Sequence, residues 1–280
     1  MRSRSRRGLL ALLVATMLLA VAGGAYAASK MVTVQASAAG VTATVSYDEN
    51  TSGVAPYSNL HLMIARDGKV LYDAAVTPPQ CARYCAPAET HPAKILDLES
   101  DGQPDVLLDV YTGGAHCCFL LDLFRHDPQT QSYAQVVHDF GDPGYKLEQL
   151  DGKPRYELVS ADDRFAYEFA AYVYSDLPRQ IWRVGGGRFI DVTRSYPQLI
   201  ARDAASWWKG WTKTRGIHDG NGELAAWAAD EYELGDSAKV KQVLSQADAA
   251  DQLRSGGFGP SGAAYIAALD KFLTQTGYIR

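Results

Sequence analysis

Alternating apolar and polar positions predict antiparallel β-strands over the larger, N-terminal part of the chain. The segment 31–49 alternates β-branched and small residues on both sides of Ala39-Gly40, as a hairpin does. The segment 60–76 places two apolar strands around Asp67-Gly68, a dipeptide favoured in tight hairpin turns. Four prolines within 77–92 predict an irregular segment there. Further strands are predicted over 106–111, 118–140 and 179–193.

The pattern changes near residue 201, where apolar residues recur every three or four positions and predict helices. Helical segments are predicted over 219–235, 236–257 and 259–277. We therefore expect an α+β protein, with a β-rich domain over 28–200 that forms a propeller-like or β-sandwich fragment, and a C-terminal helical region over 201–280. Trp207 and Trp211 share one face of a helix, which favours a core position, with a sugar-stacking platform as the alternative.

The first 27 residues have the pattern of an export signal. Four arginines lie within 2–7, an apolar run covers 9–24, and Ala25-Tyr26-Ala27 is a small-x-small cleavage sequence. We expect residues 1–27 to be removed and the protein to be periplasmic or secreted. The apolar run fits the general secretory route, whereas the stretch 5–9 resembles the twin-arginine pattern, so both routes stay open.

The charge of the mature chain bears on its partners. Removing the four arginines of the signal changes the formal net charge from −5 to −9. An acidic chain without a basic cluster argues against a nucleic-acid partner. No second apolar run approaches membrane length, so we expect no membrane span after residue 27.

Predicted export also bears on the four cysteines, which are Cys81, Cys85, Cys117 and Cys118. An even number of cysteines in an oxidising compartment predicts two disulfides. We favour two bonds that join the first pair of cysteines to the second, because adjacent side chains on a strand point to opposite faces. A zinc site or a nucleophilic thiol beside His116 is the alternative, and oxidation opposes both. His116 itself has no assigned role.

The acidic loop 97–105 (DLESDGQPD) has the composition of a calcium site. Gly102 permits a sharp turn, and calcium takes six to eight oxygen ligands. Carboxylates that lacked a cation would repel one another, so the loop predicts bound Ca²⁺, with a solvated acidic turn as the alternative. Leu108 at the twelfth position excludes an EF-hand. The predicted ligands are Asp97, Glu99, Asp101, Gln103 and Asp105.

This loop and the strand after it resemble the D-x-D-x-D-G-x-x-D signature of FG-GAP/VCBS repeats, which occur in exported bacterial proteins and integrin-like propellers. The resemblance covers about residues 90–195 and implies a calcium-stiffened binding scaffold without a reaction. A second copy follows about 50 residues later, the length of one propeller blade. Aligning the D-G-x-P sequences keeps only Asp151, so we expect no metal there. The other positions are not acidic: Leu147, Gln149 and Arg155 stand where the first copy has Asp97, Glu99 and Asp105.

Compartment and resemblance together predict an exported, calcium-binding, disulfide-containing module. We expect it to recognise a protein or a glycan of the cell envelope without catalysing a reaction. The alternative is a secreted hydrolase of envelope polymers that uses the adjacent carboxylates Asp162 and Asp163. The commoner role of adjacent carboxylates before an arginine is structural, as an ion pair with Arg164 at a turn.

Overall fold

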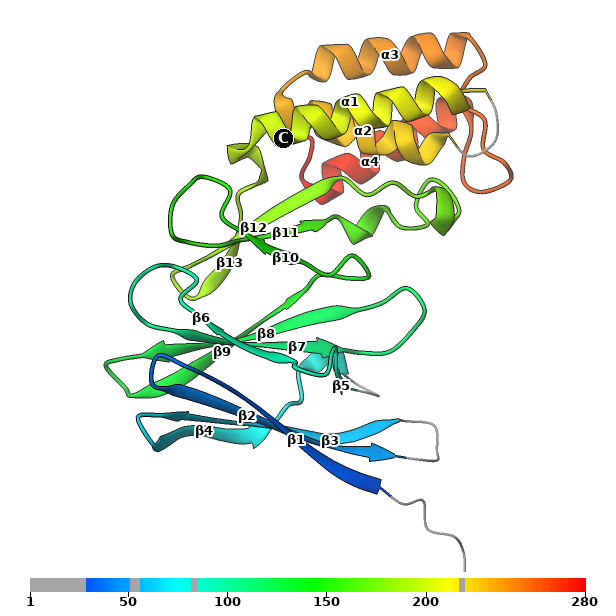
Figure 1. The fold of residues 1–280 in the computed structure, drawn as a ribbon. Helices are drawn as coiled ribbons and strands as arrows, with labels where there is room; N and C mark the ends of the chain where they lie inside the picture. The colour runs from blue at the N-terminus through cyan, green and yellow to red at the C-terminus, as the bar shows by residue number, and fades with distance from the viewer. Residues whose placement is uncertain (1–28, 51–55, 82–84, 217–219) are drawn as a thin grey trace, which may run out of the picture.

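The computed structural model describes residues 29–50, 56–81, 85–216 and 220–280. Within these residues, thirteen strands form three antiparallel sheets and four helices follow them, which confirms the α+β class. Figure 1 shows the sheets stacked on one another, with the helices over the third sheet. The predicted signal segment 1–27 lies outside the described residues.

Sheet A is a meander of two hairpins. Its strands pair in chain order: β1 (Ser29–Ala38), β2 (Val41–Asn50), β3 (Tyr57–Arg66) and β4 (Lys69–Ala75). The hairpin turns fall at Ala39-Gly40 and at Asp67-Gly68, and all four of these residues have positive φ. Positive φ at both central residues is the geometry of a type I′ turn, so both predicted hairpins are confirmed.

Sheet B lies in the middle of the stack and is buried on both faces. Its strands are β5 (Ala86–Pro87), β6 (Ala93–Leu96), β7 (Asp105–Tyr111), β8 (Phe119–Asp127) and β9 (Ser132–Asp139). Val106, Leu108 and Val110 of β7 join the core shared with sheet A, whereas Leu107 joins the core shared with sheet C. Successive side chains on a strand point to opposite faces, so a strand covered on both faces has the near-continuous apolar run seen here.

Sheet C repeats the plan of sheet B. Its strands pair in chain order: β10 (Lys146–Glu148), β11 (Glu157–Ala161), β12 (Arg179–Gly185) and β13 (Arg188–Asp191). In sheet B, Leu96 pairs with Asp105, and in sheet C, Glu148 pairs with Glu157. The β-rich part of the described chain is therefore a stack of three antiparallel sheets, two of which have the same strand plan, and it agrees with a propeller-like fragment rather than with a two-sheet sandwich.

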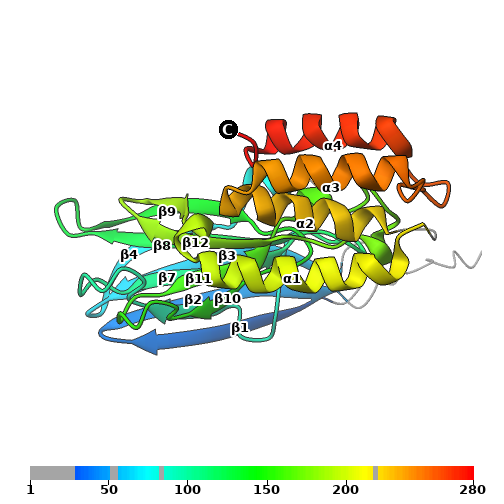
Figure 2. The ribbon, with the colours of Figure 1, turned by 90° about the horizontal axis from the view of Figure 1, so that it is seen from above.

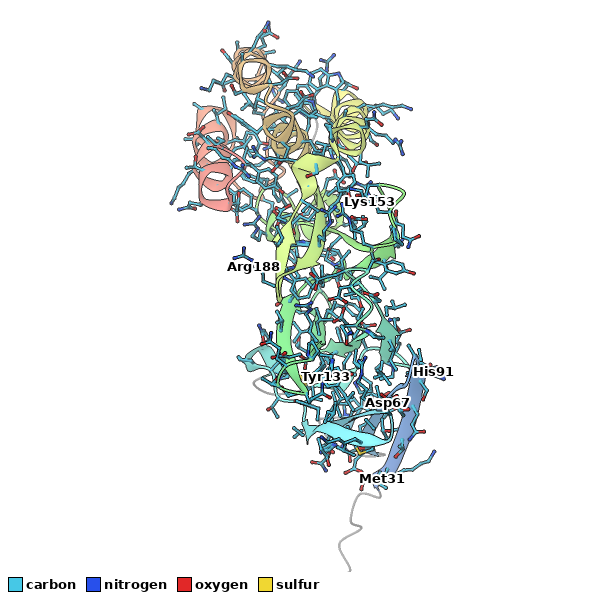
Figure 3. The ribbon with its side chains drawn as sticks, turned by 90° about the vertical axis from the view of Figure 1, so that its left-hand side faces the viewer. Met31, Asp67, His91, Tyr133, Lys153 and Arg188 are labelled. Atoms are coloured by element: carbon cyan, nitrogen blue, oxygen red, sulfur yellow. A yellow bond between two sulfur atoms is a disulfide. The ribbon has the colours of Figure 1, made fainter. Side chains whose placement is uncertain are left out.

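The helices are α1 (Pro197–Thr214), α2 (Asn221–Leu234), α3 (Ser237–Ala249) and α4 (Gly262–Thr276). The helix α1 is additional to the three helical segments predicted from the sequence. Figure 3 shows α2 at the centre of the other helices and above sheet C, which explains why its side chains are buried on nearly all sides. Phe165 and Phe169, which precede α1, belong to the helical core, so the two regions share a hydrophobic core.

Figure 2 shows the helices lying side by side over the sheets. Among the described residues, no helix has both the length and the apolar character needed to cross a membrane.

Candidate functional site

The predicted calcium loop 97–105 forms a tight acidic turn before β7. The carboxylate of Asp97 accepts hydrogen bonds from the backbone N–H groups of Asp101 (3.0 Å) and Gly102 (2.8 Å). The Asp101 carboxylate accepts one from the backbone N–H of Gln103 at 2.8 Å. Two of the predicted ligands therefore stabilise the turn itself.

A guanidinium group lies among the acidic side chains of this loop. Arg125 on β8 forms ion pairs with Glu99, with Asp101 (3.9 Å) and with Asp105 (3.5 Å). Burial raises the pKa of Asp105 to about 7, against the opposing effect of the Arg125 charge. The protein thus supplies a cation of its own to the loop.

The remaining predicted ligand also faces a protein donor, since Arg66 donates to the side-chain oxygen of Gln103 at 3.1 Å. In the described part of the chain, no group of three or more His, Cys, Asp or Glu side chains is arranged to hold a metal ion. Oxygen atoms that meet several protein donors do not form a cage of six to eight ligands around one ion. Calcium could be ligated here only after protein donors such as Arg125 release these oxygens, and calcium binding stays a prediction.

The loop before β11 is built like the loop before β7. The residues of the two loops correspond in part differently from the predicted alignment. The backbone N–H of Leu150 donates to Glu157 at 3.1 Å, as that of Leu98 donates to Asp105 at 3.4 Å. The turn residues correspond as the D-G-x-P alignment predicts, since Asp101 and Asp151 each accept a hydrogen bond from the backbone N–H two residues later. In the strand that follows, the correspondence is shifted by two residues, so Glu157, not Arg155, corresponds to Asp105.

The second loop also has its arginine. Arg183 on β12 pairs with Glu157 at 2.8 Å and lies 3.9 Å from Asp151, and Arg125 makes the corresponding contacts in the first loop. Arg155 adds a second guanidinium beside Asp151. Both repeated loops therefore pair a carboxylate at the start of a central strand with an arginine on the next strand.

The four cysteines form two local disulfides, Cys81–Cys85 and Cys117–Cys118, so the predicted bonds between the two segments are wrong. The prediction treated the second pair as part of a strand. In the structure, β8 begins at Phe119 and both cysteines lie in the preceding loop, where the rule of opposite faces does not apply. Since no cysteine is free, the zinc and thiol alternatives have no thiol to use.

His116 belongs to an exposed group of rings beside the second disulfide. Its ring stacks on that of Tyr172 with centroids 3.7 Å apart, and the ring of Tyr167 lies 5.2 Å from Tyr172. We call these three residues the aromatic cluster. Asp142 accepts a hydrogen bond from the Tyr172 hydroxyl and lies 3.9 Å from Nδ1 of His116. The cluster therefore has one acidic residue that contacts two of its rings.

A cavity of about 570 Å³ opens between sheets B and C, and we call it the Asp109 pocket after the buried carboxylate in its wall. Asp109 accepts hydrogen bonds from the Tyr145 hydroxyl (2.6 Å) and from the Lys94 ammonium. The same ammonium lies 2.8 Å from Glu89. The apolar part of the lining comes mainly from Phe119, Leu120, Pro143 and Leu147.

The charges of the Asp109 pocket are balanced. Burial acts to lower the pKa of Lys94, but its hydrogen bonds to Asp109 and Glu89 outweigh burial and the pKa is raised. Burial and the Asp109 charge raise the pKa of Tyr145, which keeps its proton. Lys146 also lines the pocket, so two lysines face two carboxylates and the wall has no net charge.

The adjacent carboxylates Asp162 and Asp163 border a different cavity, of about 380 Å³. Asp162 is buried and accepts hydrogen bonds from the Arg164 guanidinium (2.7 Å) and the Tyr278 hydroxyl (2.9 Å), which confirms pairing with arginine at a turn. Burial raises the pKa of Asp163 and lowers that of His138, in the same cavity, to about 4. Of these two adjacent carboxylates, Asp163 is therefore the one that keeps an oxygen for acid–base chemistry.

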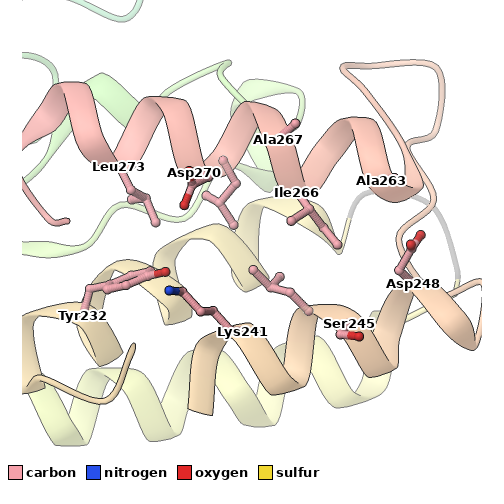
Figure 4. Close-up of a pocket in the computed structure, with 11 residues that line it drawn as sticks. Tyr232, Lys241, Ser245, Asp248, Ala263, Ile266, Ala267, Asp270 and Leu273 are labelled. Atoms are coloured by element: carbon pink, nitrogen blue, oxygen red, sulfur yellow. The ribbon is translucent and has the colours of Figure 1, made fainter. Parts of the chain in front are cut away.

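A third cavity, of about 430 Å³, lies in the groove between α3 and α4 (Figure 4). Leu244, Leu269 and Leu273 form part of its floor, and Asp248 and Asp270 carry charges at its edge. This groove contains none of the predicted site residues.

The tryptophans of α1 belong to the helical core, as their spacing predicts. Trp211 is buried and Trp207 packs against the same core. A sugar-stacking platform does not form on this helix face.

Sequence reasoning missed the residues that build the Asp109 pocket. The available signal was one aspartate inside the apolar run VLLDVY, because a charge in a strand covered on both faces needs a partner. Its partners Lys94 and Tyr145 stand 15 and 36 residues away, and no spacing rule connects such positions.

No model of a known protein family matches the chain, and the FG-GAP/VCBS resemblance stays a prediction. The chain is similar to a probable thylakoid lumen protein of Synechocystis sp., with 29% identity over 172 residues, which cover 54% of this chain and 46% of that protein. It is also similar to an uncharacterized protein of Sinorhizobium fredii, with 31% identity over 145 residues, which cover 51% and 23% of the two chains. The chain thus spans less than half the length of these relatives.

Proposed function

We propose that the protein is an exported, non-enzymatic binding module and that the Asp109 pocket holds one sugar unit of an envelope glycan. The observation that carries this proposal is the pocket itself, about 570 Å³ with paired charges and an apolar remainder. A cavity of this size takes a small unit rather than the broad surface of a protein partner. Export is supported by the signal pattern in 1–27, by the two disulfides and by the thylakoid lumen name of one relative.

The lining suits a neutral ligand that is rich in hydroxyl groups. Lys94 has three N–H donors and directs two of them to Glu89 and Asp109, which leaves one for a ligand. The Glu89 side chain is 53% exposed and can accept a hydrogen bond from a hydroxyl. Because a sugar hydroxyl both donates and accepts, it can use both groups, while Phe119 offers apolar surface to the C–H groups.

Titration with β-1,4-linked tetramers of N-acetylglucosamine, glucose and mannose tests the proposal. We expect one of the three to bind with equal affinity at low and high salt, since the ligand is neutral and the wall has no net charge. Glu89→Gln should weaken binding about tenfold, because a hydrogen bond to a charged group contributes about 1.5–3 kcal/mol. The exposed substitution Lys153→Met is the control and should bind as wild type. Binding of none of the tetramers, or affinity that falls with salt, contradicts the proposal.

Calcium binding by the loop 97–105 is a separate part of this proposal. Arg125 must leave Glu99 and Asp105 before their oxygens can ligate an ion. The test is the melting temperature of the wild-type protein in calcium and in chelator. A lower value in chelator that Asp101→Ala abolishes supports the site, and equal values remove calcium from the proposal.

The second candidate is a secreted hydrolase of envelope polymers. It is favoured by the position of Asp163 in a cavity, where burial raises the pKa of its carboxyl, the direction of shift that a general acid needs. Asp162 is committed to Arg164 and Tyr278 and contributes no acid or base. If Asp163→Asn keeps the melting temperature but abolishes turnover of a cell-wall glycan, the hydrolase replaces the binding module.

A further inference from the structure

We infer that the glycan is bound as a chain, with one sugar unit in the Asp109 pocket and another on the aromatic cluster of His116, Tyr167 and Tyr172. The ligand is then a neutral oligosaccharide rather than a monosaccharide. This inference rests on the proposed function, and it adds a second subsite and a ligand length.

The pocket and the aromatic cluster are built from the same two segments of the chain. Asp142 contacts the cluster, and the next residue, Pro143, lines the pocket. His116 belongs to the loop that ends at Cys118, and the next residue, Phe119, lines the pocket. Asp142 and Pro143 are consecutive, with Cα atoms about 3.8 Å apart, and His116 and Phe119 are three residues apart, so each segment passes from one site to the other within a few residues.

Backbone contacts fix the spacing of the two sites. The N–H of Phe119 donates to the carbonyl of Gly141 at 2.8 Å, and the N–H of Phe140 donates back to the carbonyl of Phe119 at 2.9 Å. The disulfide Cys117–Cys118 lies in the same loop. Because the two segments are already tied together, a chain that spans both sites orders little additional backbone when it binds.

The cluster has the chemistry of a surface for a sugar ring. Aromatic rings are apolar on their faces and, in tyrosine and histidine, polar at one edge, which matches the separate C–H and hydroxyl surfaces of a pyranose. The side chain of His116 is 42% exposed and Tyr167 is 48% exposed. Tyr172 donates its hydroxyl to Asp142, so its ring is held in place beneath His116.

The backbone of Tyr167 adds an independent observation. Its φ is +64°, in the left-handed region that bulky residues rarely adopt. The conformation is held by a hydrogen bond from the Tyr167 N–H to Oγ of Ser175 at 3.0 Å. Strained backbone of this kind clusters at binding and catalytic sites, and here it presents an exposed ring beside His116.

Affinity as a function of chain length tests the inference. The probes are the monomer to tetramer of β-1,4-linked N-acetylglucosamine, glucose and mannose, titrated into the full protein. We expect the tetramer of the series that binds to bind about tenfold more tightly than its monomer, as one added aromatic contact provides. Tyr167→Ala should remove this gain. Tyr174→Ala, which removes a ring that is 52% exposed nearby but outside the cluster, is the control and should keep it.

The outcomes separate the inference from the proposed function. Binding that does not strengthen with length overturns the inference and leaves the pocket as the site of a single unit. A gain that persists in Tyr167→Ala also overturns it, because the chain then runs over another surface. Binding of no probe at any length contradicts the proposed function itself.

Discussion

The loop before β7 and the loop before β11 share a backbone plan and differ in charge. In both, a backbone N–H donates to the first carboxylate of the strand, and an arginine on the next strand pairs with that carboxylate. The first loop sets Asp97, Glu99, Asp101 and Asp105 against Arg125. The second sets Asp151 and Glu157 against Lys153, Arg155 and Arg183.

The difference shows which part of the repeat is structural. Cations exceed carboxylates in the second loop, where the Glu157 side chain is fully buried. Carboxylates exceed cations in the first loop, where burial raises the pKa of Asp105 to about 7. Both strands nevertheless keep their paired arginine, Arg125 or Arg183. The two copies therefore share the arginine and the carboxylate that begins the strand, and do not share the other acidic residues of the first loop.

The strongest test of this comparison is to remove the arginine of the second loop. Arg183→Met should lower the free energy of unfolding by about 3 kcal/mol, because a buried carboxylate loses a partner while Arg155 remains 3.5 Å away. Denaturant unfolding at neutral pH measures the change. The exposed substitution Arg188→Met is the control and should stay within about 0.5 kcal/mol of wild type. Equal losses of stability in Arg183→Met and Arg188→Met would contradict the structural role of Arg183.

Removing the arginine of the first loop should cost less. Arg125→Met is expected to lower the free energy of unfolding by about 1–2 kcal/mol at pH 8 and by less at pH 5. The reason is that Asp105, whose pKa is about 7, is protonated at pH 5. Its neutral carboxyl then makes no ion pair that the loss of Arg125 could remove. The same denaturation at both pH values provides the measurement. A loss that is independent of pH would show that Asp105 does not titrate with the loop.

The carboxyl of Asp105 should also contribute to the pH dependence of the free energy of unfolding of the wild-type protein. Its folded pKa of about 7 lies above the unfolded value near 4, so its stabilising contribution is complete below pH 4 and is lost as the pH rises through 7. Asp105→Asn should flatten the fall in stability between pH 5 and 8. Part of the fall remains, since the pKa values of Asp122, Asp176 and Asp230 are raised too. Parallel slopes in the two proteins would contradict the assignment.

The smallest expected effect concerns calcium. Calcium should raise the melting temperature of Arg125→Met by more than that of wild type, because removing the guanidinium leaves Glu99 and Asp105 without their cation. Arg183→Met is the matched variant and should gain less, since its loop holds two carboxylates and keeps Arg155. Melting curves with calcium and with magnesium measure both. Equal shifts in the two variants would mean that the first loop has no special affinity for the ion.

Much of the fold could be predicted from the sequence because it depends on local rules. The hairpin turn at Asp67-Gly68 and the buried run 106–111 are decided by turn geometry and by strand periodicity. The helix over 197–214 was not among the predicted segments, although the spacing of Trp207 and Trp211 placed both on one face of a helix. Expected domain boundaries at 28–200 and 201–280 stay predictions, although the first helix begins before residue 201.

The candidate site depends on contacts between distant residues, and the sequence predicted little of it. Asp109 meets Tyr145 only because sheets B and C stack, and Arg125 reaches Asp105 only through the register of β7 and β8. The cysteine pairing failed for a similar reason. Whether Cys117 and Cys118 stand on a strand or before it depends on where β8 begins, and the pattern of residues does not fix a strand end so closely.

The face-to-face stacking of the sheets has a consequence for how the protein can change over evolutionary time. A ring-shaped propeller must keep its number of blades, because losing one opens the circle. In this stack, each described sheet packs only against its neighbours, and sheet A lies at one end with an outer face that no described residue covers (Figure 1). A sheet could therefore be added at that end by duplication, while the core between sheets A and B stays covered and the pocket between sheets B and C is inherited unchanged.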